Sequence, residues 1–146
     1  MNKFYIKDAN LFNFWNSWKK ANRNYKVIFP KNRLQFPEPL TKFIAEKIDS
    51  SLISTNKNAD PYDFKGNIEV KSSAKRQGVT PFKKTQNECK RILFFLIIDN
   101  VIEYYDINDE SILKNINDDI NSEKYNNIIL EKYISCIPKT IIIINK

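Results

Sequence analysis

The stretch RILFFLIIDNVIEYYDI (residues 91–107) contains two runs of β-favouring residues on either side of an Asp99-Asn100 pair. Aspartate and asparagine are frequent in tight turns, so the pattern predicts two strands joined by a hairpin turn. The first run is apolar at successive positions, which is typical of a strand that is covered on both faces. It therefore predicts a central strand of a β-sheet.

Three other segments have the apolar spacing of helices. Leucine, isoleucine, phenylalanine and tryptophan recur in them at intervals of three and four residues, which places these side chains on one face of a helix. We expect the helices at about residues 9–23, 38–50 and 108–120. The candidate N-caps are Asp8 or Asn10 for the first helix and Asn108 or Asp109 for the third.

Further strand signals lie between and after these helices. The β-favouring segments Tyr62–Phe64 and Asn67–Ser72 flank Lys65-Gly66, which predicts a short hairpin. TIIIINK (140–146) predicts a final strand, and NNIILEKYIS (126–135) fits either a helix or a strand. Together the patterns predict an α/β or α+β domain with a central mixed sheet of about five strands, flanked by helices.

The length and composition favour one domain. A chain of 146 residues suits a single hydrophobic core, and the sequence has only two glycines and no repeat or linker. We expect N-terminal helices within residues 1–50, a central core at about 51–107, and a C-terminal helix and strand region at 108–146.

The net charge restricts the chemistry of the protein. The formal charge of +7 favours binding to polyanions, although the excess of lysine, asparagine and isoleucine could also come from an AT-rich coding sequence. The chain has no histidine, which removes the usual general base and all histidine-based metal sites. Any catalysis must therefore use carboxylates, lysines, hydroxyls or a hard metal ion.

The apolar runs and the cysteines point to a cytoplasmic protein. No run approaches the roughly 20 residues that span a bilayer, and the N-terminus MNKFYIKDAN lacks the pattern of a signal peptide. We therefore expect no membrane contact and a cytoplasmic location. Cys89 and Cys136 have no neighbours at zinc-ligand spacing, so we expect two reduced, buried thiols.

The segment ADPYDFKGNIEVKSS (59–73) carries the candidate chemistry. Strand residues alternate between faces, so Glu69 and Lys71 point the same way. The preceding arm of the hairpin can bring Asp60 or Asp63 alongside Glu69. Two carboxylates and the backbone carbonyl of Val70 would form a cluster of oxygen ligands, which is what Mg²⁺ prefers. The pattern therefore predicts a divalent-metal site with a lysine beside it.

A plain surface hairpin is the competing interpretation of this segment, because short acid-x-Glu-x-Lys patterns are frequent in charged chains. Three features favour chemistry. The two aspartates precede Glu69 by nine and six residues across a turn, and the hydroxyls of Ser72 and Ser73 follow, where a backbone could pass close to DNA. The basic residues come next: Lys75, Arg76, Lys83 and Lys84.

The same segment resembles the signature of the PD-(D/E)xK nuclease superfamily, and the arrangement is similar to small type II restriction endonucleases. The lead-in FWNSWKKAN…FPEPLTKFIAEKI also resembles the N-terminal helices of some of these enzymes. The resemblance implies that Asp60 is a metal ligand, with Asp63 as the second choice for this role. It implies that Glu69 is the second ligand and Lys71 the catalytic lysine. Some members add a helical glutamate, a position that Glu46 could fill.

The resemblance implies a DNA endonuclease that depends on Mg²⁺, with Mn²⁺ as a substitute. Cleavage of both strands of double-stranded DNA by one small subunit favours a homodimer, because a two-fold duplex matches two copies of one active site. A Holliday-junction resolvase or repair nuclease would share the site. A non-catalytic nucleic-acid-binding module or a structural protein would also be compatible with the basic charge. The expected DNA contacts are Ser72, Ser73, Lys75, Arg76, Thr80, Lys83, Lys84 and Gln86.

Trp15 and Trp18 leave a further choice open. A tryptophan pair could form a stacking platform for bases, but both residues belong to the apolar stripe of the first helix. Packing in the core or in a dimer interface is the expected role.

Overall fold

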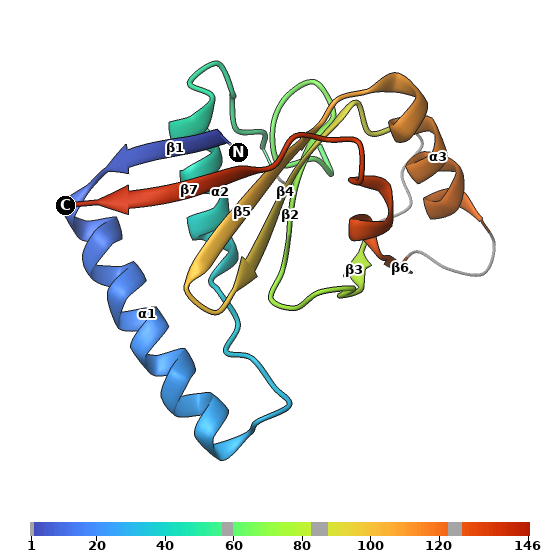
Figure 1. The fold of residues 1–146 in the computed structure, drawn as a ribbon. Coiled ribbons are helices and arrows are strands. Elements are labelled where there is room, and N and C mark those ends of the chain that lie inside the picture. Colours follow the sequence, from blue (N-terminus) through green and yellow to red (C-terminus); the bar gives the residue numbers. More distant parts are fainter. Residues whose placement is uncertain (1, 57–59, 83–87, 123–126) are drawn as a thin grey trace.

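A computed structural model describes residues 2–56, 60–82, 88–122 and 127–146. Its main feature is a five-stranded mixed sheet in the order β1-β7-β5-β4-β2 (Figure 1). The strands are β1 (Asn2–Lys7), β2 (Ile68–Ser73), β4 (Arg91–Ile98), β5 (Val101–Ile107) and β7 (Thr140–Asn145). The β4–β5 and β5–β7 pairs are antiparallel, whereas β1–β7 and β2–β4 are parallel. The predicted α/β class and mixed sheet are confirmed.

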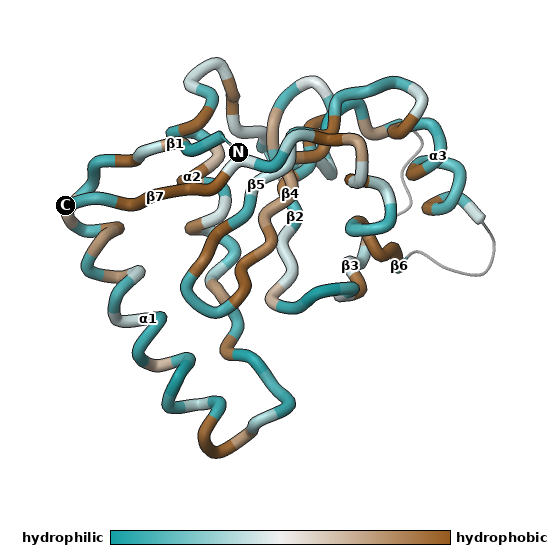
Figure 2. Tube along the Cα trace, in the orientation of Figure 1, coloured by the Kyte–Doolittle hydropathy of each residue, from teal (hydrophilic) through white to brown (hydrophobic). Residues whose placement is uncertain are grey.

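The central hairpin forms where the sequence predicts it. Ile98 pairs with Val101, and the intervening Asp99 has a φ of 54°, a left-handed conformation that aspartate tolerates in tight turns. The six residues from Ile92 to Ile97 are all buried. Figure 2 shows the corresponding concentration of apolar residues along β4 and β7. The apolar run therefore marks a strand that is covered on both faces.

Three helices cover the two faces of this sheet: α1 (Ala9–Ile28), α2 (Glu38–Ile48) and α3 (Glu110–Asn121). Asp8 caps α1 by accepting a hydrogen bond from the Leu11 backbone, and Asp109 caps α3 in the same way. Both caps were among the predicted candidates. The helix α1 is longer than expected and reaches residue 28.

Alternate residues of β4 belong to two separate cores. Leu93, Phe95 and Ile97 pack in one cluster with buried residues of α1 and α2. Ile92, Phe94 and Leu96 pack in the other with α3 and the short 3-10 helix η1 (Leu130–Tyr133). The alternation of a strand thus places α1 and α2 over one face and α3 over the other, an arrangement that Figure 1 shows.

Trp15 and Trp18 belong to the core. Their rings stack at 5.5 Å between centroids, both side chains are buried, and both rings pack against Phe36. The Trp18 indole also donates a hydrogen bond to the Gln35 carbonyl. The base-stacking interpretation is therefore wrong for the folded protomer, and neither ring offers a surface for a dimer contact.

Several other segments differ from the prediction. The strand β1 was not expected. The predicted arm Tyr62–Phe64 is reduced to single bridges from Phe64 to Ser54 and to Ile68. The ambiguous segment 126–135 provides both β6 (Asn127–Ile128), which pairs with β3 (Thr80–Pro81), and η1.

The two cysteines are both free, but only Cys89 is buried; Cys136 is exposed, contrary to expectation. Burial raises the pKa of the Cys89 thiol to about 12. In the part of the chain that the structure describes, no helix has the length and apolar character needed to cross a membrane.

Candidate active site

The outer edge of β2 is the framework of the candidate site. Among the described residues, the only strand that pairs with β2 in the five-stranded sheet is β4, and the other edge of β2 makes an isolated bridge from Ile68 to Phe64. On that edge the backbone N–H of Val70 donates a hydrogen bond to Oδ2 of Asp63 at 2.8 Å. In a strand the N–H and the C=O of one residue point to the same side, so the Val70 carbonyl also faces this edge. Asp63 and the Val70 carbonyl are therefore neighbours.

A tight turn places Asp63 there. Phe64 and Ile68 exchange two backbone hydrogen bonds, at 3.0 and 3.3 Å, around the three residues 65–67. Gly66 has a φ of 90° and Asn67 a φ of 61°, and both values lie in the left-handed region that glycine and asparagine tolerate best. The chain therefore reverses immediately before β2 and lays Asp63 against its edge.

Glu69 and Lys71 lie on the face of β2 opposite to the buried Val70. The Lys71 ammonium is 3.9 Å from Oε2 of Glu69 and sits 4.7 Å from the ring centroid of the buried Phe82. A cation over an aromatic face is attracted by the ring and loses mobility. Phe82 therefore helps to hold the Lys71 charge beside Glu69.

The carboxylates of Glu69 and Asp63 line the same cavity and are close enough to interact. Their side chains are only 14% and 12% exposed. Burial raises the pKa of Glu69 above the usual range of a glutamate; the Lys71 charge opposes this rise, and the charge and hydrogen bond of Asp63 add to it. Two crowded carboxylates of this kind need either a shared proton or a cation.

Lys42 provides a cation from α2. Its ammonium lies 2.6 Å from Oδ1 of Asp63 and 3.9 Å from Glu38. Burial by itself would lower the pKa of Lys42, but the hydrogen bond and the charge of Asp63 outweigh burial, and the pKa is raised. Lys42 therefore stays charged and joins α2 to the edge of β2.

These groups surround one small cavity of about 210 Å³. It brings together four of the predicted catalytic and metal-binding side chains, Asp60, Asp63, Glu69 and Lys71, with the two α2 residues. Its lining consists of Glu38, Lys42, Asp60, Pro61, Tyr62, Asp63, Glu69 and Lys71.

Asp60 also lines this cavity, and its side chain makes a local contact. Its Oδ1 accepts a hydrogen bond from the backbone N–H of Tyr62 at 2.8 Å, which is a local turn contact. Asp63 takes the place beside Glu69 because the arm before β2 is one bridged residue rather than a strand. Between the two aspartates that the sequence offered, the geometry favours Asp63 as the partner of Glu69.

The glutamate predicted from the second helix, Glu46, lies outside the cavity lining. Glu46 is exposed, accepts a hydrogen bond from the Ser54 hydroxyl at 3.2 Å, and is not among the residues that line the cavity. Glu38, in the first turn of α2, lines it instead. The helix that was expected to contribute a glutamate does so two turns earlier, together with Lys42.

The donor set fits a magnesium ion of the kind that keeps most of its water. No group of three or more acidic, cysteine or histidine side chains that could hold a metal occurs among the described residues. Mg²⁺ in nucleotide-processing sites typically uses one or two carboxylates plus waters and substrate phosphate. Asp63, Glu69 and the Val70 carbonyl could provide that number of oxygen ligands.

The predicted DNA contacts fall into four groups. Ser72, Ser73 and Lys75 lie at and just beyond the end of β2, next to a second cavity. The Arg76 guanidinium is bound by Glu103 and Glu131, so a phosphate would have to compete with two carboxylates. Thr80 is buried and only 2% exposed. Lys83, Lys84 and Gln86 lie outside the described residues.

Three residues of the site were not predicted from the sequence: Glu38, Lys42 and Phe82. The spacing of Glu38 and Lys42 on one helix face was visible, but nothing local indicated that this face would meet Asp63. Phe82 lies between a proline and a polar run, and no periodic apolar pattern there marked it as a buried residue.

The chain has no significant match to any protein-family model, curated protein or solved structure with which it was compared. The resemblance to PD-(D/E)xK nucleases therefore rests on the sequence of the candidate site and of the N-terminal lead-in.

Proposed function

We propose that the protein is a Mg²⁺-dependent DNA endonuclease with a restriction-endonuclease-like fold. The single observation that carries this proposal is the cavity in which Asp63, Glu69 and Lys71 converge. Two neighbouring buried carboxylates concentrate negative charge, which Lys42 neutralises only at Asp63, and a lysine on the same face as Glu69 adds the positive charge that a phosphodiester would meet. A surface hairpin has no need for this arrangement.

The roles of the side chains follow from their positions. Mg²⁺ held by Asp63, Glu69 and the Val70 carbonyl would acidify a water molecule and neutralise charge on the phosphoryl group. Lys71, held by Glu69 and Phe82, would stabilise the negative charge of the transition state and orient the attacking water. Asp60 lines the cavity and remains the second candidate ligand. Mn²⁺ is the expected substitute ion.

Incubation of the purified protein with plasmid DNA tests the proposal. We expect nicked or linear product with Mg²⁺ or Mn²⁺ and none with EDTA. The variants Glu69→Gln and Lys71→Ala, purified in parallel, should be inactive, which separates the activity from a contaminating nuclease. Undiminished cleavage in EDTA would show that the activity does not need a metal ion. Cleavage by the two variants would show that the active site lies elsewhere.

A non-catalytic nucleic-acid-binding module is the second candidate. The observation that favours it is the Lys42–Asp63 ion pair, because an acid that is neutralised by a lysine can be purely structural. Such a module would bind DNA equally well with or without a divalent ion and would cut nothing. The plasmid experiment therefore separates the two candidates. A Holliday-junction resolvase or repair nuclease would differ only in the DNA that is cut.

We propose double-stranded DNA as the substrate, cytoplasm as the location and a homodimer as the active form, since two identical sites suit a two-fold duplex. Trp15 and Trp18 cannot mediate the contact because they are buried. Apolar side chains remain exposed at the other end of α1, at Val27 and Ile28, which are 81% and 71% exposed. Sedimentation of the free and DNA-bound protein tests the assembly; a monomer in both states would contradict it.

A further inference from the structure

A second, larger cavity lies at the far end of β2. Its volume is about 520 Å³, within the range of ligand-binding pockets. One wall is the segment between α1 and α2, and the other is the end of β2 with the loop that follows it. Its polar lining includes Lys31, Arg33, Gln35, Ser72, Ser73 and Lys75. We call it the basic cleft.

The basic cleft carries uncompensated positive charge. Three cations line it and, among the described residues, no carboxylate does. Lys31 and Lys75 are exposed and make no ion pair with any residue that the structure describes. Arg33 is 3.9 Å from Asp99, and its Nε is buried without a hydrogen-bond partner in the described chain. The segment between α1 and α2 brings Lys31, Asn32, Arg33 and Gln35 to one wall, and the tube over this segment is mostly hydrophilic in Figure 2. The cleft therefore suits an anionic ligand.

The basic cleft and the candidate active site share two segments of chain. The segment between α1 and α2 provides Lys31 to Arg33, Gln35 and Phe36 to the cleft, and the start of α2 then provides Glu38 and Lys42 to the small cavity. The strand β2 provides Glu69 and Lys71 to the small cavity, and its end and the following loop provide Ser72 to Lys75, Gly78 and Val79 to the cleft. The two hollows therefore follow each other along the edge of β2.

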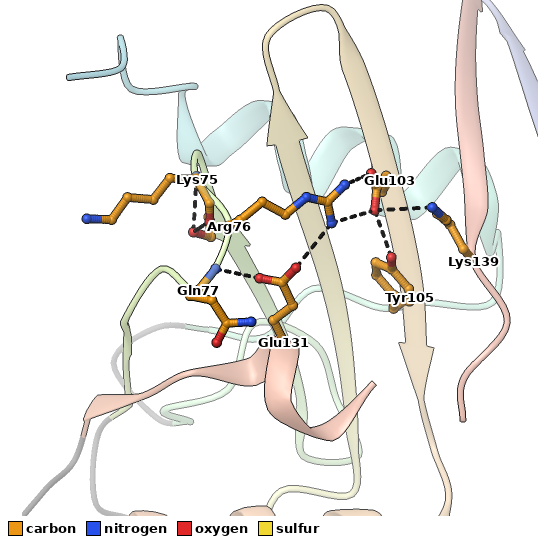
Figure 3. A network of polar contacts seen from close by, with 8 residues as sticks. Lys75, Arg76, Gln77, Glu103, Tyr105, Glu131 and Lys139 are labelled. Carbon is orange, nitrogen blue, oxygen red and sulfur yellow. Dashed lines mark hydrogen bonds and ion pairs between the residues drawn. The ribbon is translucent and has the colours of Figure 1, made fainter. Parts of the chain in front are cut away.

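The loop that forms one wall is held in place. Arg76 binds the buried Glu103 of β5 and also Glu131 of η1, and the Gln77 backbone N–H donates to the same Glu131. Figure 3 shows Arg76 pointing into this network, whereas the side chain of Lys75 extends away from it. The network thus fixes the loop while leaving the neighbouring ammonium free to meet a ligand.

We propose that the basic cleft binds the phosphodiester backbone of the nucleic-acid strand, on one side of the phosphate that Lys71 meets. This inference rests on the proposed nuclease function. Ser73 is two residues from Lys71, roughly 7 Å along the strand, and a DNA strand carries one phosphate per roughly 3.4 Å of helix axis. The cleft would hold the first few flanking phosphates, with ammonium groups and hydroxyls as donors. A duplex and a single strand both offer this backbone.

The double variant Lys31→Ala/Lys75→Ala tests the cleft, and Lys3→Ala/Lys7→Ala is the matched control. The control removes the same charge from exposed lysines of β1, at the opposite edge of the sheet. Binding is measured by fluorescence anisotropy in Ca²⁺ over a salt series, with labelled duplex and single-stranded oligonucleotides. We expect the cleft variant to lose about tenfold or more in affinity and the magnitude of its salt slope to fall by up to about 2. The control should change affinity by less than about threefold.

The two oligonucleotides distinguish the possible ligands. A loss with both supports a contact to the backbone that they share, and a loss with one alone identifies that form as the ligand. Equal binding by the cleft variant and the control, with both oligonucleotides, would overturn the inference. That outcome leaves the nuclease proposal intact if plasmid cleavage still requires Glu69 and Lys71. Conversely, if the protein cuts no DNA but the cleft variant and the control differ in binding as expected, the proposed binding cleft would stand and the proposed nuclease activity would be wrong.

Discussion

Lys42 and Asp63 form a close ion pair, with 2.6 Å between Nζ and Oδ1, that joins helix α2 to the edge of strand β2. The other oxygen of Asp63 accepts the Val70 backbone N–H at 2.8 Å. The lysine thus provides a positive charge at the point where the proposed magnesium ion would share the carboxylate of Asp63 with Glu69. A metal ion and this ammonium should therefore compete for the site.

We expect Lys42→Gln to bind Mn²⁺ more tightly than the wild-type protein, by a few-fold, because the variant removes a competing charge at short range. Asp63→Asn should weaken binding by at least tenfold. Titration calorimetry or the paramagnetic signal of Mn²⁺ measures both. Weaker binding by Lys42→Gln would show that the lysine supports the metal site instead of competing with it.

The cavity contains two aspartates, and their environments predict different consequences of substitution. Asp63→Asn keeps an oxygen for the Val70 N–H but removes the charge beside Glu69, so we expect cleavage to fall by about 10²-fold or more. Asp60→Asn keeps the local turn contact and should cost less than about tenfold. Single-turnover cleavage measures both variants, which remove equal charge. A greater loss for Asp60→Asn would return the ligand role to that residue.

Lys71→Ala should separate chemistry from binding. The protein carries a net charge of +7, so one lysine contributes little to DNA affinity, which reflects the sum of phosphate contacts. The loss of a positive charge at the transition state should reduce the rate of the bound complex by about 10³-fold. Binding is measured in Ca²⁺, and cleavage is measured in Mg²⁺ under single-turnover conditions. A bound complex of Lys71→Ala that cuts at nearly the wild-type rate would make this lysine ordinary surface charge.

The elements that depend on local sequence patterns could be predicted. The β4–β5 hairpin follows from a long apolar run and an Asp99-Asn100 turn, and α3 from its spacing and its Asp109 cap. β1 could not be predicted in this way, because five of its six residues are not buried and only Ile6 is. Its partner is β7, at the other end of the chain. Pairings over such distances leave little trace in a short window of sequence.

The sequence predicted the strand residues of the site but not which aspartate or which helix residues lie beside them. The alternation of β2 correctly places Glu69 and Lys71 on one face. The choice between Asp60 and Asp63 depended on the length of the arm before β2, which the left-handed residues Gly66 and Asn67 shorten to a single bridge at Phe64. The role of Lys42 could not be predicted from the sequence, because its contact with Asp63 forms only when α2 packs beside β2.

The raised pKa of Glu69 predicts a stability that depends on pH in the metal-free protein. Burial and Asp63 favour the protonated side chain in the folded state, despite the opposing charge of Lys71. Above the ordinary pKa of a glutamate, about 4.3, the native protein therefore retains a proton that the unfolded chain has lost. Because the native state then binds more protons, the free energy of unfolding falls as the pH rises toward the raised value.

Glu69→Gln should remove this dependence, since glutamine resembles the protonated glutamate and can donate to Asp63. We expect the variant and the wild-type protein to have similar stability in mild acid, and the variant to become more stable by about 1 kcal/mol or more at mildly alkaline pH. Urea unfolding in EDTA across this range measures the difference. Glu46→Gln removes the same charge outside the cavity and controls for net charge. A wild-type protein that gains stability relative to Glu69→Gln as the pH rises would mean that Glu69 is ionised in the native state and that the neighbouring lysines compensate its charge without a metal ion.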